Sequence, residues 1–240
     1  MTEHEIIQAI VRIKSQANLS LDPHQAALIV VDMQRYFVRP EYPFAQTIEK
    51  VMPGATDGYF KRVNATVLGN VQRLLAAFRS RKLPVIYLGV GCCLEDGRDL
   101  PGWMRDFDQA GLAMVGERVH PPVNHPSWQI DDSVAPLAGE MVLNKTSSGA
   151  LASTKLDQTL HNLGVTSLVV CGLTTAVCVT QTARETADRG FRVVVAEDAC
   201  TEMSVELHDA ALLAFGWVFG RVSPTGKIVS LFEAAAKASV

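Results

Sequence analysis

The sequence has no surplus of positive charge, no unbroken apolar segment at its N-terminus and no even set of cysteines. Its 240 residues include 22 lysines and arginines against 25 aspartates and glutamates, a formal net charge of -3. Binding to a phosphate backbone needs a basic surplus, so we expect no nucleic-acid partner. Glu3, Glu5 and Arg12 interrupt the first segment, which argues against a secretory signal. Five cysteines without such a signal predict free thiols in a cytoplasmic protein.

One long segment, residues 158–183, contains no Asp, Glu, Lys or Arg. Its length would suit a membrane span, but its Asn, Ser, Thr and Gly side chains argue against burial in lipid. An apolar fraction of 48% with 20% charged residues is typical of a globular protein rather than a disordered chain or a coiled coil. We therefore expect a globular protein with no membrane partner.

Short apolar, β-branched segments alternate with segments of helical period. Strands that are buried on both faces are predicted at residues 27–31, 84–90, 167–171 and 192–196, with a shorter one at 141–144. Helices are predicted at residues 60–78, 154–163, 176–189, 204–216 and 225–237. This alternation predicts an α/β fold: a three-layer, doubly wound, mostly parallel, Rossmann-like sheet.

The chain divides into a short extension and one larger domain. Residues 1–25 are predicted as an N-terminal helical extension, with an amphipathic helix over the first 18 residues, and residues 26–240 as the main domain. Thr154 and Asp157 resemble a capping box that opens a helix ending at Gly164. Residues 91–130 hold Gly, Pro and two Trp with little periodicity, which is typical of a lid or a binding wall.

Three reactive side chains follow three of the predicted strands. Asp32 comes directly after the first, Lys145 after the strand at 141–144, and Cys178 begins the helix after the strand at 167–171. Ligands of open parallel sheets bind beyond the carboxyl ends of the strands. Each residue alone has a structural explanation, as a cap, a surface lysine or a buried thiol, but their coincidence at one edge predicts nucleophilic catalysis.

The predicted chemistry assigns one role to each residue. Only about 3% of an ordinary thiol is ionised at pH 7, so we expect the helix start and Lys145 to stabilise a Cys178 thiolate. Asp32 would take the thiol proton and return it to a leaving amine. Backbone N–H groups of Thr174 and Cys178 would form an oxyanion hole.

Three segments carry a resemblance to a known family. ALIVVDMQ, VLNKTSSGA and VVCGLTTAVCVTQTARETADRGFRVVVAEDAC resemble the signature blocks of the isochorismatase-like cysteine hydrolase superfamily, over a stretch from Ala26 to the C-terminus. The resemblance implies a catalytic triad of Asp32, Lys145 and Cys178. It also implies a cis peptide bond before Thr174 and assembly into a homo-oligomer, a dimer or a tetramer.

The same resemblance implies an activity. Members with this cysteine hydrolyse C–N bonds of small linear amides or ureido (N-carbamoyl) compounds, so we expect a cysteine amidohydrolase that releases ammonia through a thioester. The segment GVGCCLED at residues 89–96 lacks the His of the metal motif that nicotinamidases share. We therefore expect no metal and no cofactor.

The sequence is compatible with several alternatives. The chain could be an isochorismatase-type or nicotinamidase-type hydrolase, a non-catalytic binding protein on the same fold, or a redox protein that pairs Cys178 with Cys200 or Cys93. Tyr36, Phe37 and Trp103 are candidate substrate-binding residues, since aromatic walls suit a planar amide. A carboxylate-bearing substrate would need a basic partner; the candidates in the predicted loops are Arg35, Arg39, Arg98 and Arg105.

Overall fold

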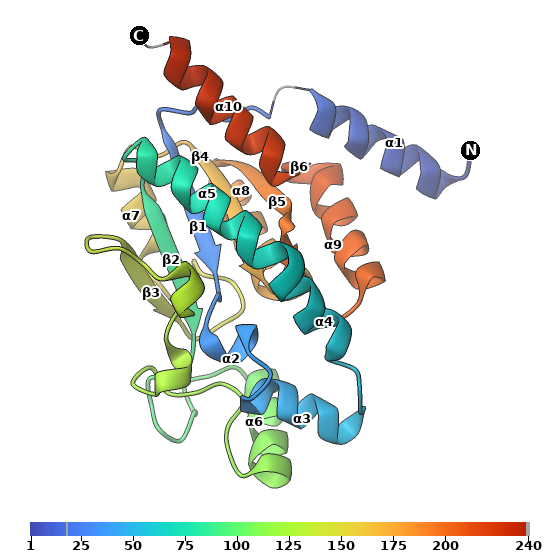
Figure 1. The fold of residues 1–240 in the computed structure, drawn as a ribbon, viewed down its shortest axis with the longest axis vertical. Coiled ribbons are helices and arrows are strands. Elements are labelled where there is room, and N and C mark those ends of the chain that lie inside the picture. The colour runs from blue at the N-terminus through green and yellow to red at the C-terminus, as the bar shows by residue number, and fades with distance from the viewer. Residues whose placement is uncertain (18, 239–240) are drawn as a thin grey trace.

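The computed structural model describes residues 1–17 and 19–238. Residue 18 of the predicted extension and residues 239–240 of the predicted domain lie outside the described residues. At the centre is a sheet of six parallel strands in the order β3-β2-β1-β4-β5-β6 (Figure 1). The strands are β1 (Ala26–Val31), β2 (Val85–Val90), β3 (Met141–Lys145), β4 (Ser167–Leu173), β5 (Arg192–Thr201) and β6 (Arg221–Ser223).

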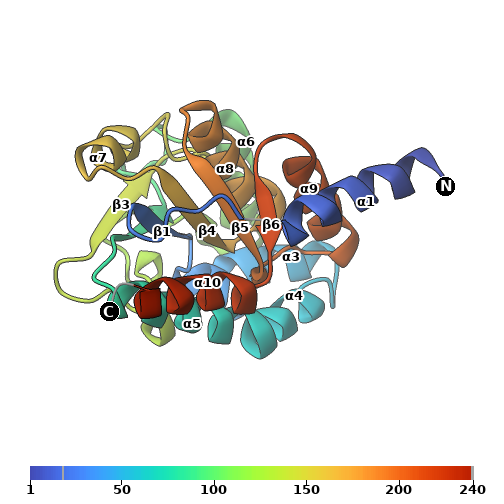
Figure 2. The same ribbon diagram turned by 90° about the horizontal axis from the view of Figure 1, so that it is seen from above.

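Helices cover both faces of the sheet (Figure 2). One face carries α5 (Leu68–Ser80) and α10 (Thr225–Ala238), and the other carries α7 (Leu156–Asn162) and α8 (Thr180–Asp188). The helix α9 (Val205–Val218) packs against α8 and β6. The predicted three-layer α/β fold with a parallel sheet is confirmed.

The core strands are buried along their whole length. All residues of β1, β2 and β4 are buried, because helices cover both faces and leave no side exposed to water. The strand β1 lies between β2 and β4, with Val31 opposite Leu88 on one side and Gly172 on the other. The ends of the central strands are therefore at one level, and this alignment positions the residues that follow them.

The strand β5 is longer than the sequence predicted. It continues past residue 196 to Thr201, with a register shift against β4 between Val170 and Gly172. The predicted strand stops before the acidic residues Glu197 and Asp198, but in the structure the Asp198 carboxylate accepts hydrogen bonds from the N–H and the hydroxyl of Thr225, at 2.7 Å each. These hydrogen bonds satisfy the Asp198 carboxylate within β5, and the strand continues past it.

Two helix predictions are refined by the structure. The apolar stripe at residues 60–78 is one helical stretch: α4 (Asp57–Arg62), a π-helical turn (Val63–Val67) and α5. The predicted capping box at Thr154 is wrong, because α7 begins after Lys155, and Thr154 instead accepts from the N–H of Leu156. Gly164, with φ +66°, follows the last turn as predicted.

The predicted lid segment contains a helix that its sequence did not reveal. The helix α6 (Gly102–Val115) packs on α3 (Pro43–Val51), which with α2 (Arg35–Val38) was also not predicted. These helices lie together beyond the carboxyl ends of the strands (Figure 1). The short strand β6 was missed as well, since three residues give too little alternation to be recognised.

The first helix lies on the outside of the domain. The helix α1 (Glu3–Gln16) projects beside α9 (Figure 2) and has no buried residue. Its Lys14 ammonium donates to the carbonyl oxygens of Gly216 and Trp217, which anchors it there. Its isoleucines at positions 6, 10 and 13 are exposed. The association of copies through this stripe stays a prediction.

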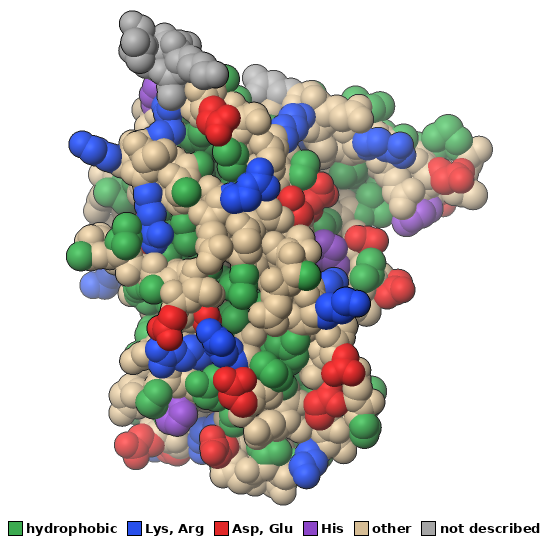
Figure 3. Space-filling model, in the orientation of Figure 1, with side chains coloured by type: hydrophobic (Ala, Val, Ile, Leu, Met, Phe, Trp, Pro, Cys, Tyr) green, Lys and Arg blue, Asp and Glu red, His purple; other side chains and the backbone are tan. Residues whose placement is uncertain are grey.

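Charge on the surface is mixed. Figure 3 shows Lys and Arg side chains interspersed with Asp and Glu across the face that it draws. Over residues 1–17 and 19–238, no helix is both long and apolar enough to cross a membrane.

Candidate active site

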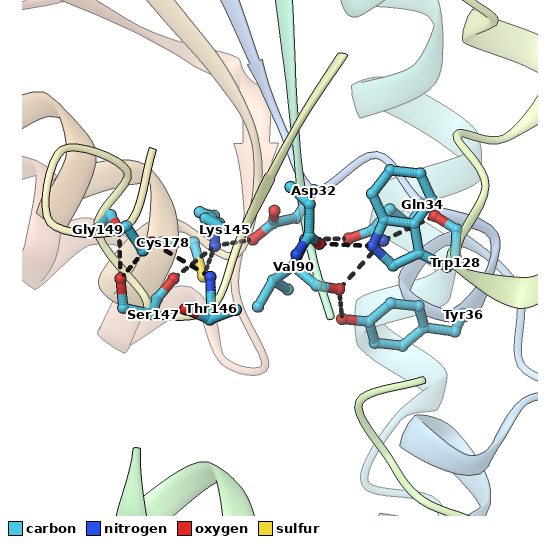
Figure 4. A network of polar contacts seen from close by, with 12 residues as sticks. Asp32, Gln34, Tyr36, Val90, Trp128, Lys145, Thr146, Ser147, Gly149 and Cys178 are labelled. Carbon is cyan, nitrogen blue, oxygen red and sulfur yellow. Dashed lines mark hydrogen bonds and ion pairs between the residues drawn. The ribbon is translucent and has the colours of Figure 1, made fainter. Parts of the chain in front are cut away.

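Three strand ends bring Asp32, Lys145 and Cys178 together. Asp32 follows β1, Lys145 is the last residue of β3, and Cys178 lies in a π-helical turn (Thr175–Val179) directly after β4. In Figure 4 the Lys145 ammonium lies between the Asp32 carboxylate and the Cys178 sulfur. Asp32, which is more than a hundred positions from the other two residues, therefore meets them at the edge of the sheet that the sequence predicted.

The contacts of Lys145 define this cluster. Its Nζ lies 2.9 Å from Asp32 Oδ2 and 3.3 Å from Cys178 Sγ, and it donates to the carbonyl oxygen of Ser147 at 3.2 Å. Asp32 and Lys145 are fully buried and Cys178 is 4% exposed. One ammonium thus contacts both the acid and the thiol, away from bulk water.

Burial dominates the ionisation of these groups. Burial raises the pKa of Asp32 above that of an ordinary aspartate, although Lys145 and Cys178 act to lower it. Burial acts to lower the pKa of Lys145, but its contacts with Asp32 and Cys178 outweigh this effect and the pKa is raised. The ammonium is therefore held in its charged form.

The thiol differs from the sequence-based expectation. Burial and the Asp32 carboxylate raise the pKa of Cys178 well above that of a free cysteine, although Lys145 lowers it. This environment therefore disfavours the resting thiolate that the sequence led us to expect. The physical reason is burial of the sulfur, to which Asp32 adds a nearby negative charge, and the spacing of residues along the chain could show neither.

The turn that carries Cys178 follows two unusual backbone conformations and is hydrogen-bonded by a buried carboxylate. Gly172 adopts φ +117°, and the Leu173–Thr174 peptide bond is cis, as the family resemblance implied. The Glu202 carboxylate accepts hydrogen bonds from the N–H groups of Ala176 at 2.8 Å and Met203 at 2.9 Å. Glu202 thus connects this turn to the residues after β5.

Cys178 opens into a small cavity of about 240 Å³. Of the predicted binding residues, Phe37 and Trp103 line it, as do the predicted oxyanion-hole residues Thr174 and Cys178. Tyr36 does not line it: the side chain is fully buried behind Phe37, and its hydroxyl donates to the Val90 carbonyl oxygen. The wall also includes Phe44, Ile48, Val90, Met104, Phe107, His120, Val177, Glu202 and Met203.

A larger hollow of about 470 Å³ lies between α5 and α10, away from the strand ends. It is lined by side chains such as Arg73, Arg81 and Phe232 and contains no cysteine. The smaller cavity at Cys178 is therefore the candidate active site.

His120 was not predicted as a site residue. It lies in the cavity wall, where its Nδ1 is 2.8 Å from Oδ1 of the fully buried Asp108, and the same oxygen accepts the His120 backbone N–H at 2.9 Å. Arg118 lies 3.6 Å from the other carboxylate oxygen. Neither His120 nor Asp108 belongs to a local motif, and only the folding of the segment after β2 brings them together.

Gln34 was also missed. Its side-chain amide accepts from the N–H of Val90 at 2.8 Å and donates to the carbonyl oxygens of Val90 and Trp128 (Figure 4). These bonds tie the segment after β1 to the end of β2 two residues beyond Asp32. Its position in the block ALIVVDMQ was the one available signal.

The described residues form neither a metal site nor a disulfide bond. Within the described part of the chain, no group of three or more His, Cys, Asp or Glu side chains is placed to hold a metal ion. All five cysteines are free thiols, and Cys93 is the exposed one.

Comparison with known proteins identifies the family. Residues 26–226 match the Isochorismatase domain family. The chain belongs to the isochorismatase-like hydrolase family. The sequence-based resemblance is thereby confirmed, and the match ends fourteen residues before the C-terminus.

Two curated relatives are amide hydrolases by name. The ureidoacrylate amidohydrolase RutB of Methylobacterium radiotolerans is 31% identical over 235 residues, which cover 90% of this chain and 81% of RutB. The N-carbamoylsarcosine amidase of an Arthrobacter species is 26% identical over 211 residues, which cover 88% of this chain and 72% of the relative.

Solved structures agree on the fold of this family member. A cysteine hydrolase from Pseudomonas syringae pv. phaseolicola superposes with a TM-score of 0.74 and 25% identity, and covers 90% of this chain and 95% of its own. The layered parallel sheet is therefore the fold of a hydrolase family.

Proposed function

We propose that this isochorismatase-like hydrolase is a cysteine amidohydrolase that cleaves the C–N bond of a small linear amide or ureido (N-carbamoyl) compound and releases ammonia. The observation that carries the proposal is the buried Lys145 ammonium, which contacts both Asp32 and Cys178 beside the cavity that Cys178 lines. The names of the two amide-hydrolysing relatives support the same reaction.

The first half of the reaction forms an acyl-enzyme. Cys178 Sγ attacks the substrate carbonyl carbon while Asp32 takes the thiol proton, so the sulfur ionises only as the new bond forms. The N–H groups of Thr174 and Cys178 hold the developing oxyanion. Collapse of this intermediate expels ammonia, which leaves with the proton from Asp32, and a thioester remains on Cys178.

The second half regenerates the enzyme. Water attacks the thioester and gives a proton to Asp32, and collapse breaks the C–S bond and returns that proton to the sulfur. Lys145 stays protonated throughout, since its pKa is raised by both partners. Its charge compensates the carboxylate in one step and the forming thiolate in the next.

Covalent trapping tests the proposal. Wild-type protein is mixed with a panel of small amides and ureas, and ammonia release is followed; an acid quench during turnover followed by intact-mass measurement should show one acyl group added. Cys178→Ala should abolish both signals, whereas Cys93→Ser, at an exposed thiol outside the cavity, should preserve both. Undiminished ammonia release by Cys178→Ala would refute the proposal.

A further inference from the structure

The cavity that contains Cys178 has no basic side chain in its wall. Of the residues that line it, none is an arginine or a lysine. The arginines that the sequence offered are engaged or exposed elsewhere: Arg35 pairs with Asp132, Arg39 with Asp131 and Arg98 with Asp96, and Arg105 is exposed. Lys145 lies beneath the sulfur, already paired with Asp32. A substrate carboxylate would therefore meet no free cation.

The wall does carry a negative charge. Glu202 lines the cavity, and its carboxylate is held in place by the N–H groups of Ala176 and Met203. A second carboxylate brought into this small space would face Glu202. This charge disfavours an anionic ligand.

His120 contributes a hydrogen-bonding atom to the wall. Its Nδ1–H is directed at Oδ1 of the buried Asp108, whose other carboxylate oxygen lies 3.6 Å from Arg118. Its Nε2 has no hydrogen-bond partner among the described residues. Nε2 is therefore available to hydrogen-bond a ligand in the cavity.

The remainder of the wall is aromatic and apolar. The ring centroids of Phe37 and Phe44 are 4.9 Å apart and those of Phe44 and Phe107 are 6.3 Å apart, both in edge-on arrangements. Trp103 lies at 50% exposure on the same wall. Such surfaces favour an alkyl or aryl group, and the volume of about 240 Å³ is below that of a site for a drug-sized molecule.

We propose that the substrate of this amidohydrolase is an uncharged small amide or urea with a branched alkyl or aryl substituent, not a carboxylate-bearing ureido acid. The inference rests on the proposed function for the reacting bond and goes further by naming the rest of the molecule. The apolar substituent packs among Phe37, Phe44 and Phe107. The free His120 Nε2 hydrogen-bonds a polar atom of the amide or ureido group.

A matched pair of ligands tests this selectivity. 3-Methylbutylurea and 3-ureidopropanoate share a chain length and differ chiefly in an isopropyl group in place of a carboxylate. Each is titrated by calorimetry into Cys178→Ala, so that binding is measured even for a compound that is not turned over. We expect the neutral urea to bind at least about tenfold more tightly, because an unpaired carboxylate loses its hydration on entry. Equal binding, tighter binding of the carboxylate or no binding of either compound would overturn the inference.

A second experiment tests the same inference by placing a positive charge at the cavity mouth. Trp103→Arg in the Cys178→Ala background adds a cation at a half-exposed position, and Trp103→Gln removes the same ring without adding charge. The Arg variant should shift the preference toward 3-ureidopropanoate by about tenfold relative to the Gln variant. An unchanged ratio would contradict the inference. Ammonia release by wild-type protein against Cys178→Ala tests the proposed function separately.

Discussion

The Lys145 ammonium lies 2.9 Å from Asp32 Oδ2, and both side chains are fully buried. Because both charges are buried away from bulk water, each depends on the other, and removal of one partner leaves the other uncompensated. The pair therefore links the stability of the sheet edge to the proposed chemistry. Substitutions can separate the effect of the pair on stability from its effect on activity.

Lys145→Met should unfold more readily than the wild type. The expected loss is about 3 to 5 kcal/mol in the free energy of unfolding, because Asp32 remains as an unpaired buried charge. Ammonia release should fall about 100-fold or more. Urea denaturation measures the first quantity. The double variant Asp32→Asn, Lys145→Met should regain most of the stability and none of the activity; equal stability of the single and double variants would show that the pair is not coupled.

Removal of the Asp32 carboxylate should speed the alkylation of Cys178 and slow turnover. Asp32 raises the pKa of the thiol, so Asp32→Asn should lower that pKa and speed reaction with iodoacetamide at pH 7 to 8. The same variant should lose ammonia release because the proposed base is gone. Peptide mass mapping distinguishes Cys178 from Cys93. Slower alkylation in Asp32→Asn would show that the Asp32 carboxylate does not raise the pKa of the Cys178 thiol.

The acid limb of the kcat/KM pH profile should lie at a higher pH than the pKa of an ordinary aspartate. Burial raises the pKa of Asp32, and its proposed role needs the ionised form, so activity should fall as the pH decreases through a value above the ordinary aspartate pKa of about 4. Glu202→Gln should leave the position of this limb unchanged. An acid limb at or below about pH 4 would argue against Asp32 as the base.

His120→Phe should weaken substrate binding while leaving the chemical step largely intact. The substitution keeps an aromatic ring in the wall, and Asp108 Oδ1 still accepts the backbone N–H of residue 120. We expect KM to rise about tenfold with a smaller change in kcat, since a hydrogen bond to the substrate is lost. His125→Phe, in the same loop but exposed, is the control. Identical effects of the two substitutions would exclude a specific contact at His120.

Gly172→Ala should prevent stable folding. A Cβ at this position would overlap the Val31 carbonyl oxygen, and φ +117° is unfavourable for a residue with a side chain. The expected loss is at least about 4 kcal/mol. Gly139→Ala has φ +90° with open space around the added carbon, and it should lose only about 1 to 2 kcal/mol. Thermal denaturation compares the two, and similar stabilities would refute the close approach of β1 and β4.

The sheet and the residues at its strand ends were predictable because their signals are local. Buried runs such as residues 27–31 and 167–171 contain only side chains that parallel strands accommodate. The parallel arrangement then places Asp32, Lys145 and Cys178 at one edge whatever the strand order. The structure adds the distances and shows that Cys178 is buried, which raises the pKa of its thiol.

The cavity wall could not be predicted because its contacts join segments that no local sequence pattern connects. His120 acquires its orientation from Asp108, one helix earlier, and Glu202 accepts from the N–H of Ala176, on another segment. Tyr36 and Phe37 are neighbours with similar side chains, yet only Phe37 reaches the cavity, because α2 turns the Tyr36 ring inward. Which side of a short helix is covered depends on the elements that pack on it.

The helix α6 packs mainly on α3 and supplies Trp103, Met104 and Phe107 to the cavity, while the triad residues lie at the ends of strands or directly after them. In the proposed reaction, α6 thus contributes to selectivity from a stretch of polypeptide outside the strands that carry the reacting groups. We expect that exchange of α6 alone would alter which molecules are accepted while the sheet keeps acid, amine and sulfur aligned.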